Sequence, residues 1–309
     1  MPVFDSTLQT EPTLLAGFRL RDMIARRLAD IDLLPELRET LLHLSVVDEV
    51  WGSEEWQWAW IIPAIQATFG GEDLPLQPFI AAWTTMYAAI VRLDHLQDGD
   101  GVDELLRQSG HTAAQYNLLL AYYVLATSLL DDLSPDAFPL QRIRHLYRLW
   151  SDLILRTASG QQRDLISDTE SDTVSLTSYH DLARAKTGST FALAFGGVAM
   201  LMSDDQAIID ACLVLGDLFG ALVQYHDDVL DAATQPNATL TLPVTLAEAY
   251  PEVAAGVRTP QQFWEYLYQA YRAYVEQVLT AVPEQLAARM LALFVRAFEQ
   301  IPDTPGDTA

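Results

Sequence analysis

Residues 224–231 read Gln-Tyr-His-Asp-Asp-Val-Leu-Asp, and they follow an almost wholly apolar run over residues 211–223. This pattern predicts a buried helix that delivers several carboxylates together at one end. A buried carboxylate is costly unless it is protonated, paired with a cation or bound to a metal. Because the chain offers few cationic side chains, a bound metal ion is the simplest way to accommodate these groups.

Positive charge is scarce, with 18 lysine and arginine residues against 42 aspartate and glutamate residues. The formal net charge of -24 argues against a nucleic-acid partner and against docking on anionic lipid. The one lysine, Lys186, lies in Ala-Lys-Thr-Gly-Ser-Thr beside an apolar run. Its retention indicates a specific partner for this cation.

Cysteine usage and the amino terminus bear on the compartment. A lone Cys212 in an apolar run excludes an internal disulfide and is typical of a small core hydrophobe. No basic-then-apolar leader is present, and Asp or Arg interrupts the apolar stretches too often for a span of about 20 residues. We therefore expect a cytoplasmic protein without a membrane span, folded as a single domain over residues 1–309.

Apolar residues recur at helical spacing along nearly the whole chain, and alternating strand patterns are scarce. Turn residues such as Gly70, Pro135 and Pro260 separate these segments. The pattern predicts an all-α bundle of about ten or more helices. The clearest helices are expected over residues 14–28, 37–47, 79–93, 116–130, 142–157, 191–201, 208–229, 263–279 and 284–298.

Two pairs of aspartates have helical spacing. Asp94 and Asp98 are four residues apart at the end of one predicted helix, and Asp227 and Asp231 repeat this spacing on another. Carboxylate oxygens on two core helices suit Mg²⁺, which often shares its ligands with substrate phosphates. The alternative is that Asp94 and Asp98 begin a solvated loop, since more acidic residues follow them.

Residues 224–231 resemble the second aspartate-rich motif of the trans-isoprenyl diphosphate synthases, also called polyprenyl synthetases. Residues 94–98, Asp-His-Leu-Gln-Asp, resemble their first motif, with His95 in place of the second aspartate. Residues 160–165, Tyr179, Lys186 with Thr187, and residues 241–243 follow the family's order and spacing. The resemblance covers roughly residues 80–245 and implies a class I isoprenoid synthase bundle around a central cavity.

The resemblance implies roles for the acidic motifs and their polar neighbours. Asp94, Asp98 and Asp227 match the family's ligands for three Mg²⁺ ions on the diphosphate of an allylic substrate, and Asp231 is a further candidate ligand. Lys186 and Gln224 match the groups that help draw off the leaving diphosphate. We therefore predict Lys186, Gln224 and Asp227 as catalytic residues of a Mg²⁺-dependent enzyme.

Further residues are candidates for substrate binding, namely Thr187, Arg107, Tyr87, Ala89 and Phe219. Aromatic faces such as those of Tyr87 and Phe219 can stabilise a carbocation, although core packing is the more ordinary role of an aromatic residue. In the resembling family, the residues just before motif one set chain length. The small Ala89 favours a substrate of 15 to 20 carbons, and a homodimer is also a family expectation.

The family's second substrate, isopentenyl diphosphate, is normally held by basic residues that are missing here. Residues 57–63 read Gln-Trp-Ala-Trp-Ile-Ile-Pro where the family has Gly-Lys-Arg, and only Arg107 follows motif one in place of an arginine pair. Losing three charged contacts of about 1.5 to 3 kcal/mol each removes roughly 5 to 9 kcal/mol. A micromolar site has only about 8 kcal/mol in total.

Three hypotheses remain open. The first is a class I terpene synthase, which ionises one allylic diphosphate and then cyclises, rearranges or water-quenches the cation. The second is an isoprenyl diphosphate synthase whose second site uses other arginines, such as Arg107, Arg163 or Arg184. The third is a non-catalytic subunit that regulates an active partner, which His95 in motif one favours.

Overall fold

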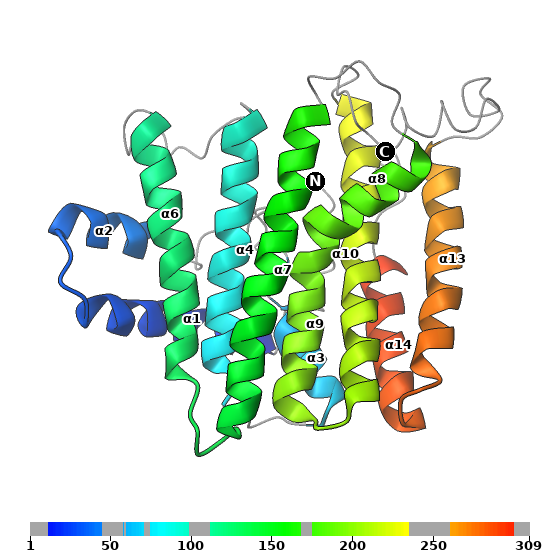
Figure 1. Cartoon of the computed structure of the whole chain (residues 1–309), viewed down its shortest axis with the longest axis horizontal. Coiled ribbons are helices and arrows are strands. Elements are labelled where there is room, and N and C mark those ends of the chain that lie inside the picture. Colours follow the sequence, from blue (N-terminus) through cyan, green and yellow to red (C-terminus); the bar gives the residue numbers. More distant parts are fainter. Residues whose placement is uncertain are drawn as a thin grey trace. The chain divides into compact units, whose positions relative to one another are not determined.

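The computed structural model describes residues 12–44, 58, 60–70, 75–98, 112–167, 175–234 and 260–299. In these ranges every regular element is a helix (Figure 1), which confirms the prediction of an all-α fold. The chain divides into two compact units, Met1–Ile143 and Arg144–Ala309. We describe each unit by itself, and the single domain over residues 1–309 stays a prediction.

Unit 1 is organised around a long apolar helix, α4, which packs against α1, α6 and η2. Phe79, Trp83 and Met86 on α4 are fully buried, as the apolar spacing predicts. The helices of this unit are α1 (Pro12–Ala29), α2 (Pro35–Leu44), α3 (Ile61–Thr68), α4 (Gln77–Asp98), α6 (Thr112–Ser128) and the 3-10 turn η2 (Leu129–Asp132).

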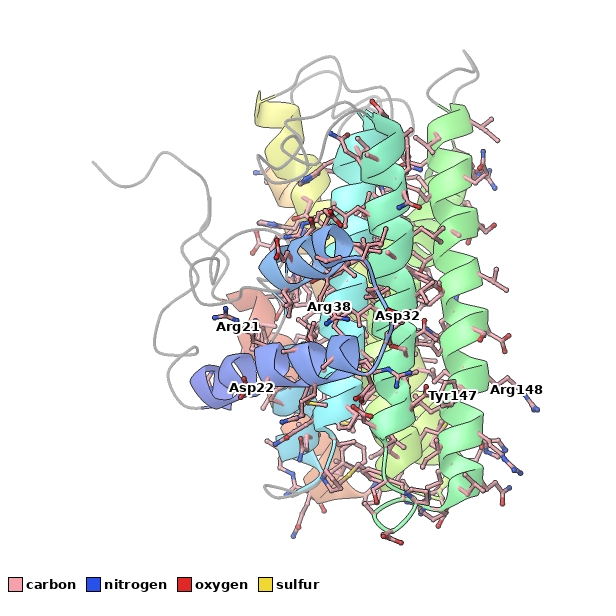
Figure 2. All side chains as sticks on the ribbon, turned by 90° about the vertical axis from the view of Figure 1, so that its left-hand side faces the viewer. Arg21, Asp22, Asp32, Arg38, Tyr147 and Arg148 are labelled. Atoms are coloured by element: carbon pink, nitrogen blue, oxygen red, sulfur yellow. The ribbon has the colours of Figure 1, made fainter. Side chains whose placement is uncertain are left out.

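Arginine side chains fasten the first helices of unit 1. Arg27 at the end of α1 donates hydrogen bonds to Ser128 Oγ at 3.1 Å and to Asp131 Oδ2 at 3.0 Å. Arg38 of α2 reaches back to the carbonyl oxygen of Ile31 at 2.9 Å, within the turn that follows α1 (Figure 2). Through these contacts α1 is tied to the end of α6, and α2 is tied to the turn before it.

Unit 2 is built on α10, which packs most extensively against α9 and the π-helical segment η3. A short turn at residues 203–205 joins α9 to α10, so the two helices run antiparallel. α7 begins at the boundary between the units. The elements are α7 (Leu140–Ser167), α8 (Leu176–Ala183), η3 (Arg184–Gly188), α9 (Ser189–Met202), α10 (Gln206–Thr234), α13 (Pro260–Leu279) and α14 (Glu284–Glu299).

Glycines allow the backbones of these antiparallel helices to touch. A Cβ at Gly216 would lie 2.4 Å from the carbonyl oxygen of Phe191 on α9. A Cβ at Gly220 would lie 2.6 Å from the carbonyl oxygen of Thr187 in η3. Any side chain at either position would force the helices apart, so the two glycines set the distance between α10 and its neighbours.

An aromatic cluster lies beside these glycines, between α9, α10 and α14. Phe219 is fully buried, with its ring centroid 5.1 Å from Phe191 and 4.8 Å from Phe298. Cys212 is also buried, its Sγ lies 3.8 Å from Met290 Sδ, and burial raises the pKa of its thiol to about 12. The predicted role of Cys212 as a small core hydrophobe is confirmed.

All nine predicted helices are present, and most are longer than their apolar pattern indicated. The prediction missed α3, α8 and η3, because elements of one or two turns hold too few residues to display a period. Asp94 and Asp98 both lie within α4, which ends at Asp98. The residues after Asp98 lie outside the described part of the chain, so the alternative that these two aspartates begin a solvated loop stays open.

Two of the described helices are long and apolar enough to span a membrane by length and composition alone, Thr112–Asp132 and Gln206–Asp228. In the fold, 44% and 72% of their apolar windows are buried, and core helices of soluble proteins pass the same test. The finding is weak evidence for a span. It also shows that charged residues interrupt these two stretches less often than the sequence argument assumed.

Candidate functional site

Lys186 and Thr187 occupy the middle of η3, where the helix widens to π geometry for one turn. The Lys186 ammonium group donates to Asp164 Oδ2 on α7 at 2.7 Å, and Thr187 Oγ1 donates to Gln224 Oε1 on α10. Two consecutive residues thus make polar contacts with two different helices. Isolated π turns of this kind are frequent at functional sites.

The Lys186–Asp164 pair is largely shielded from water, with side chains 14% and 23% exposed. Gly160, one turn earlier on α7, makes the close approach possible, because a Cβ there would lie 2.4 Å from the Lys186 backbone nitrogen. The ammonium group is therefore held at a defined place, with a carboxylate that an incoming anion has to compete with. Asp164 is thus the kind of specific partner that the sequence led us to expect for the one lysine.

Gln224 and Asp228 continue the polar chain along α10. Gln224 Nε2 donates to Asp228 Oδ1 at 3.0 Å, and the Tyr179 hydroxyl on α8 donates to Asp228 Oδ2. Asp228 is buried, with 8% of its surface exposed. Because both of its oxygens accept hydrogen bonds from protein groups, the structure gives Asp228 the role of holding Gln224 and α8 in place.

The neighbouring Asp227 has a different environment. Its side chain is 43% exposed, and Oδ1 lies 3.8 Å from Nδ1 of the buried His226. The His226 ring packs edge-on against Trp264 on α13, with centroids 5.6 Å apart. Of the two adjacent aspartates, Asp227 is the one whose carboxylate meets solvent, and its role as a metal ligand stays a prediction.

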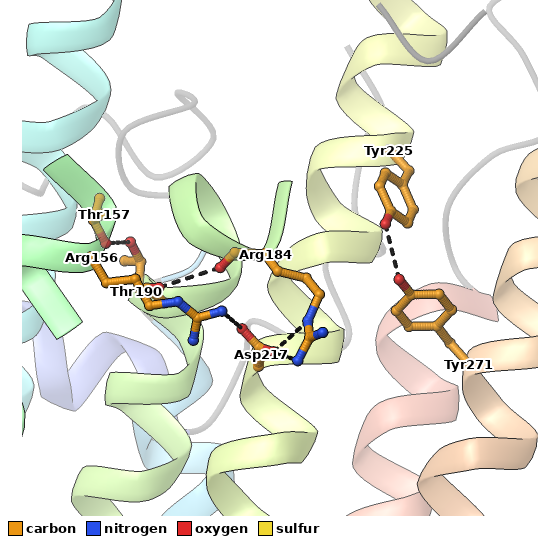
Figure 3. Close-up of polar contacts among 8 residues, drawn as sticks. Arg156, Thr157, Arg184, Thr190, Asp217, Tyr225 and Tyr271 are labelled. Carbon is orange, nitrogen blue, oxygen red and sulfur yellow. Dashed lines mark hydrogen bonds and ion pairs between the residues drawn. The ribbon is translucent and has the colours of Figure 1, made fainter. Parts of the chain in front are cut away.

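A second polar group lies beside this chain and involves the hydroxyl of Tyr225. That hydroxyl contacts His180 Nδ1 and lies 2.9 Å from the Tyr271 hydroxyl on α13 (Figure 3). Burial raises the pKa of both tyrosines and lowers the pKa of His180. At neutral pH these groups are therefore uncharged hydrogen-bonding partners that link α8, α10 and α13.

Asp217 forms a charged cluster deeper in unit 2. Asp217 Oδ2 accepts a hydrogen bond from Arg184 Nε at 2.7 Å, and Asp217 Oδ1 lies 3.4 Å from Arg156 Nη2 (Figure 3). Burial disfavours the charge on Arg184, but Asp217 outweighs that effect and raises the pKa of Arg184 above its ordinary value. Arg184 is therefore committed to a carboxylate within the fold.

In unit 1, two predicted pocket residues lie on α4 before Asp94. Tyr87 is seven residues earlier, hence on the same face, and it is buried and stacked on Trp83 with centroids 5.2 Å apart. Ala89 is 4% exposed. Arg107 and residues 241–243 lie outside the described part of the chain, as do the side chains of Asp98 and Asp231.

The donor chemistry of the acidic motifs fits magnesium. Asp94 with Asp98 and Asp227 with Asp231 are each four residues apart on one helix, and carboxylates are ligands that Mg²⁺ prefers. Within the described residues, no group of three or more His, Cys, Asp or Glu side chains is gathered around a common point. Since the two pairs belong to different units, the three-ion site stays a prediction.

Phe219 contributes to packing in the structure. It is 0% exposed and surrounded by Phe191, Phe195, Phe294 and Phe298. Nothing in these surroundings supports the predicted contact with substrate. The aromatic face of Phe219 stabilises the core between α9, α10 and α14.

Sequence reasoning missed the polar partners of the predicted residues. Asp164 and Tyr179 stood within the motif pattern without a role, and Asp228 stood beside Asp227 without one. Only Asp228 offered a signal, because it follows a long apolar run, whereas Asp164 and Tyr179 lie in mixed polar sequence. Their partners are 22 to 49 residues away, so only the fold could pair them.

Comparison with known proteins supports this assignment of motifs. Residues 111–240 match the family model described as polyprenyl synthetase. A search of curated protein sequences gives no match. The family model thus covers the segment from α6 to beyond α10, which contains Asp164, Lys186, Gln224 and Asp227.

Solved structures share the fold along nearly the whole chain. A geranylgeranyl pyrophosphate synthetase from the archaeon Geoglobus acetivorans has a TM-score of 0.74 at 17% identity, covering 95% of this chain and 98% of that one. A decaprenyl diphosphate synthase from Rhodobacter capsulatus has a TM-score of 0.71 at 16% identity, covering 96% of this chain and 99% of that one. A polyprenyl synthase from Caulobacter crescentus, complexed with calcium and isoprenyl diphosphate, has a TM-score of 0.64 at 18% identity. The match covers 94% of this chain and 96% of that one.

The TM-scores of these structures establish the fold, and the family model matches the segment that carries the polar residues described above. The chain therefore has the all-α fold of the isoprenoid synthases, and its residues 111–240 match the polyprenyl synthetase family model.

Proposed function

We propose that this protein is a Mg²⁺-dependent enzyme that ionises an allylic prenyl diphosphate. The observation that carries the proposal is the polar chain from Thr187 through Gln224 to Asp228, flanked by the Lys186 ammonium group and by half-exposed Asp227. Lysine and amide groups of this kind bind diphosphate oxygens, and Asp227, with Asp94, Asp98 and Asp231, would hold magnesium.

Ionisation places negative charge on the departing diphosphate. Lys186 offsets that charge through its ammonium group, and Gln224 is oriented for the same purpose by its hydrogen bonds to Thr187 and Asp228. Magnesium, when bound, supplies Lewis-acid stabilisation of the leaving group. An allylic chain of 15 to 20 carbons would lie along the apolar residues before Asp94, among them Tyr87 and Ala89.

For the fate of the cation, we propose capture within the same substrate or by water, as in a terpene synthase. The missing basic residues support this, and so does Arg184, whose guanidinium group is engaged by Asp217. An arginine neutralised inside the fold is a poor replacement for the lost cations of a second diphosphate site.

The second candidate is a prenyltransferase that condenses the allylic diphosphate with isopentenyl diphosphate. The names of the solved relatives favour it, since they include geranylgeranyl, decaprenyl and heptaprenyl diphosphate synthases. A non-catalytic regulatory subunit is the third candidate, and it predicts no turnover of any allylic diphosphate.

One experiment separates these candidates. The purified protein is incubated with Mg²⁺ and geranyl, farnesyl or geranylgeranyl diphosphate, each with and without isopentenyl diphosphate, and the products are identified by mass spectrometry. A hydrocarbon or alcohol formed without isopentenyl diphosphate, and lost on chelation of Mg²⁺, supports a terpene synthase. Longer diphosphates formed only with the second substrate identify a prenyltransferase, and absence of both products refutes the enzyme proposal.

We also propose that two copies of the chain associate through α6. This helix contains no charged residue, and Tyr116, Leu120 and Val124 line one exposed face of it, at 43%, 62% and 57%. In a chain with a net charge of -24, an uncharged apolar face lets a second copy approach with little repulsion. Leu120→Glu should give monomers by light scattering, whereas Leu155→Glu, at an exposed leucine on α7, should not.

A further inference from the structure

Asp217 is a buried carboxylate that the proposed reaction leaves without a role. It lies on α10, ten residues before Asp227, and only 5% of its surface is exposed. Arg184 reaches Oδ2 twice, with Nη2 at 2.6 Å and Nε at 2.7 Å, while Arg156 Nη2 lies 3.4 Å from Oδ1. A buried charge is retained only when such partners neutralise it, so the cluster of two arginines and one aspartate is a built feature.

Arg184 is the first residue of η3, and the backbone of the same segment rests on α10 at its other end. A Cβ at Gly188 would lie 2.7 Å from the Asp217 carbonyl oxygen and 2.9 Å from Asp217 Oδ1. Asp217 therefore contacts η3 at both ends, through its side chain at Arg184 and through its backbone at Gly188. Figure 3 shows Arg184 and Asp217 facing each other across this contact.

A π turn needs such support. Its wider hydrogen-bonding pattern is rare compared with the α-helix and occurs mostly as single turns inside longer helices. Here α8 precedes η3 directly and α9 follows it directly, so local sequence alone favours one continuous α-helix. Relaxation of η3 to α geometry would rotate Lys186 and Thr187 relative to α7 and α10.

We propose that Asp217 is a positioning residue, which by pairing with Arg184 holds η3 in place and so fixes where Lys186 presents its ammonium group. Lys186 itself lies between the two contact points, and its Nζ is 2.7 Å from Asp164 on the opposite helix. The consequence for catalysis rests on the proposed function, whereas the consequence for the position of Lys186 does not.

The chain has one lysine, which provides a direct probe. Protein labelled with ¹³C,¹⁵N-lysine gives a single side-chain signal, so the Lys186 resonance needs no assignment. In the wild-type protein we expect a rigid ε-methylene signal with a hydrogen-bonded ammonium group. In Asp217→Asn, which keeps the shape of the side chain and removes its charge, the signal should shift and its order parameter should fall.

Two further variants keep this test decisive. Arg184→Gln removes the same ion pair from its half-exposed partner and should reproduce the change even if Asp217→Asn does not fold. Glu276→Gln removes another arginine–carboxylate pair, Arg272 with Glu276 at 3.3 Å on α13, and should leave the signal unchanged. An unaltered Lys186 signal in a folded Arg184→Gln protein would overturn the proposal.

Turnover gives a second readout. If Asp217 acts through Lys186, Asp217→Asn should lower kcat about tenfold, and it should cause no further loss in a Lys186→Ala background. Equal losses in both backgrounds would show that Asp217 acts independently of Lys186. If the wild-type protein turns over no allylic diphosphate, the proposed function fails, and the lysine signal alone still decides the role of Asp217.

Discussion

α10 and α4 each carry two aspartates one turn apart near their carboxyl ends, and different contacts are described around the two helices. α10 is fixed by backbone contact at Gly216 and Gly220 and by polar partners of Asp217, Gln224 and Asp228. On α4, Phe79, Trp83 and Met86 are fully buried, and Arg92 lies over the Tyr122 ring at 5.7 Å. Polar and backbone contacts depend on direction, whereas apolar packing depends mainly on volume.

The difference indicates how each helix tolerates change. A single polar substitution on α10 should disturb the geometry of several helices at once, because its partners lie on α8, η3 and α7. Volume-conserving apolar substitutions on α4 should be tolerated.

The largest effect is expected from Asp227→Ala. If its half-exposed carboxylate binds magnesium, turnover should fall more than about 1,000-fold, equivalent to roughly 4 kcal/mol, while the melting temperature changes little. Asp228→Asn is the matched control, because it should lower the melting temperature and leave the Mg²⁺ concentration for half-maximal turnover nearly unchanged. Equal loss of Mg²⁺ dependence in both variants would contradict the distinction between the two aspartates.

The next largest effect is expected from Gly220→Ala. The new Cβ meets backbone atoms of Thr187 and Gly188, which cannot move separately, so we expect a loss of about 3 kcal/mol in the free energy of unfolding. Gly196→Ala places its Cβ against the Leu213 side chain, which can change rotamer, and should cost about 1 kcal/mol or less. Urea denaturation measures both losses, and similar values would argue against backbone contact at Gly220.

A smaller difference should separate Gln224→Leu from Met86→Leu. Gln224→Leu removes the acceptor of the Thr187 hydroxyl and the donor to Asp228 Oδ1, and it should destabilise the fold by about 1 to 3 kcal/mol. Met86→Leu conserves volume in the buried face of α4 and should cost less than about 1.5 kcal/mol. Thermal unfolding of the two variants tests whether the stability of α10 depends on its hydrogen bonds and that of α4 on the volume of its side chains.

The smallest effect concerns His180. Because burial lowers its pKa below the ordinary value of 6.5, the folded state binds this proton less readily than the unfolded state. Its contribution is fully present above pH 6.5 and is lost as the pH falls below that value. His180→Gln should therefore flatten the decline in stability between pH 6.5 and 5. At pH 8 both proteins carry a neutral side chain, so the difference there measures the lost contact with Tyr225 alone.

The sequence by itself determined the all-α class, the positions of the long helices and the identity of Lys186, Gln224 and Asp227 as candidates. Helical periodicity and turn residues are local properties, so they can be read within windows of a dozen residues. The motif spacing supplied the family resemblance. Short elements such as α3 and α8 hold too few residues to display a helical period, so the sequence did not reveal them.

Only the tertiary structure decided which polar groups meet. It paired Lys186 with Asp164 and Arg184 with Asp217, and it gave adjacent Asp227 and Asp228 opposite environments. It also widened residues 184–188 to a π turn and buried Phe219 in an aromatic cluster. The physical reason is that hydrogen bonds and ion pairs act over a few ångströms between residues far apart in the chain, and burial depends on which helices pack together.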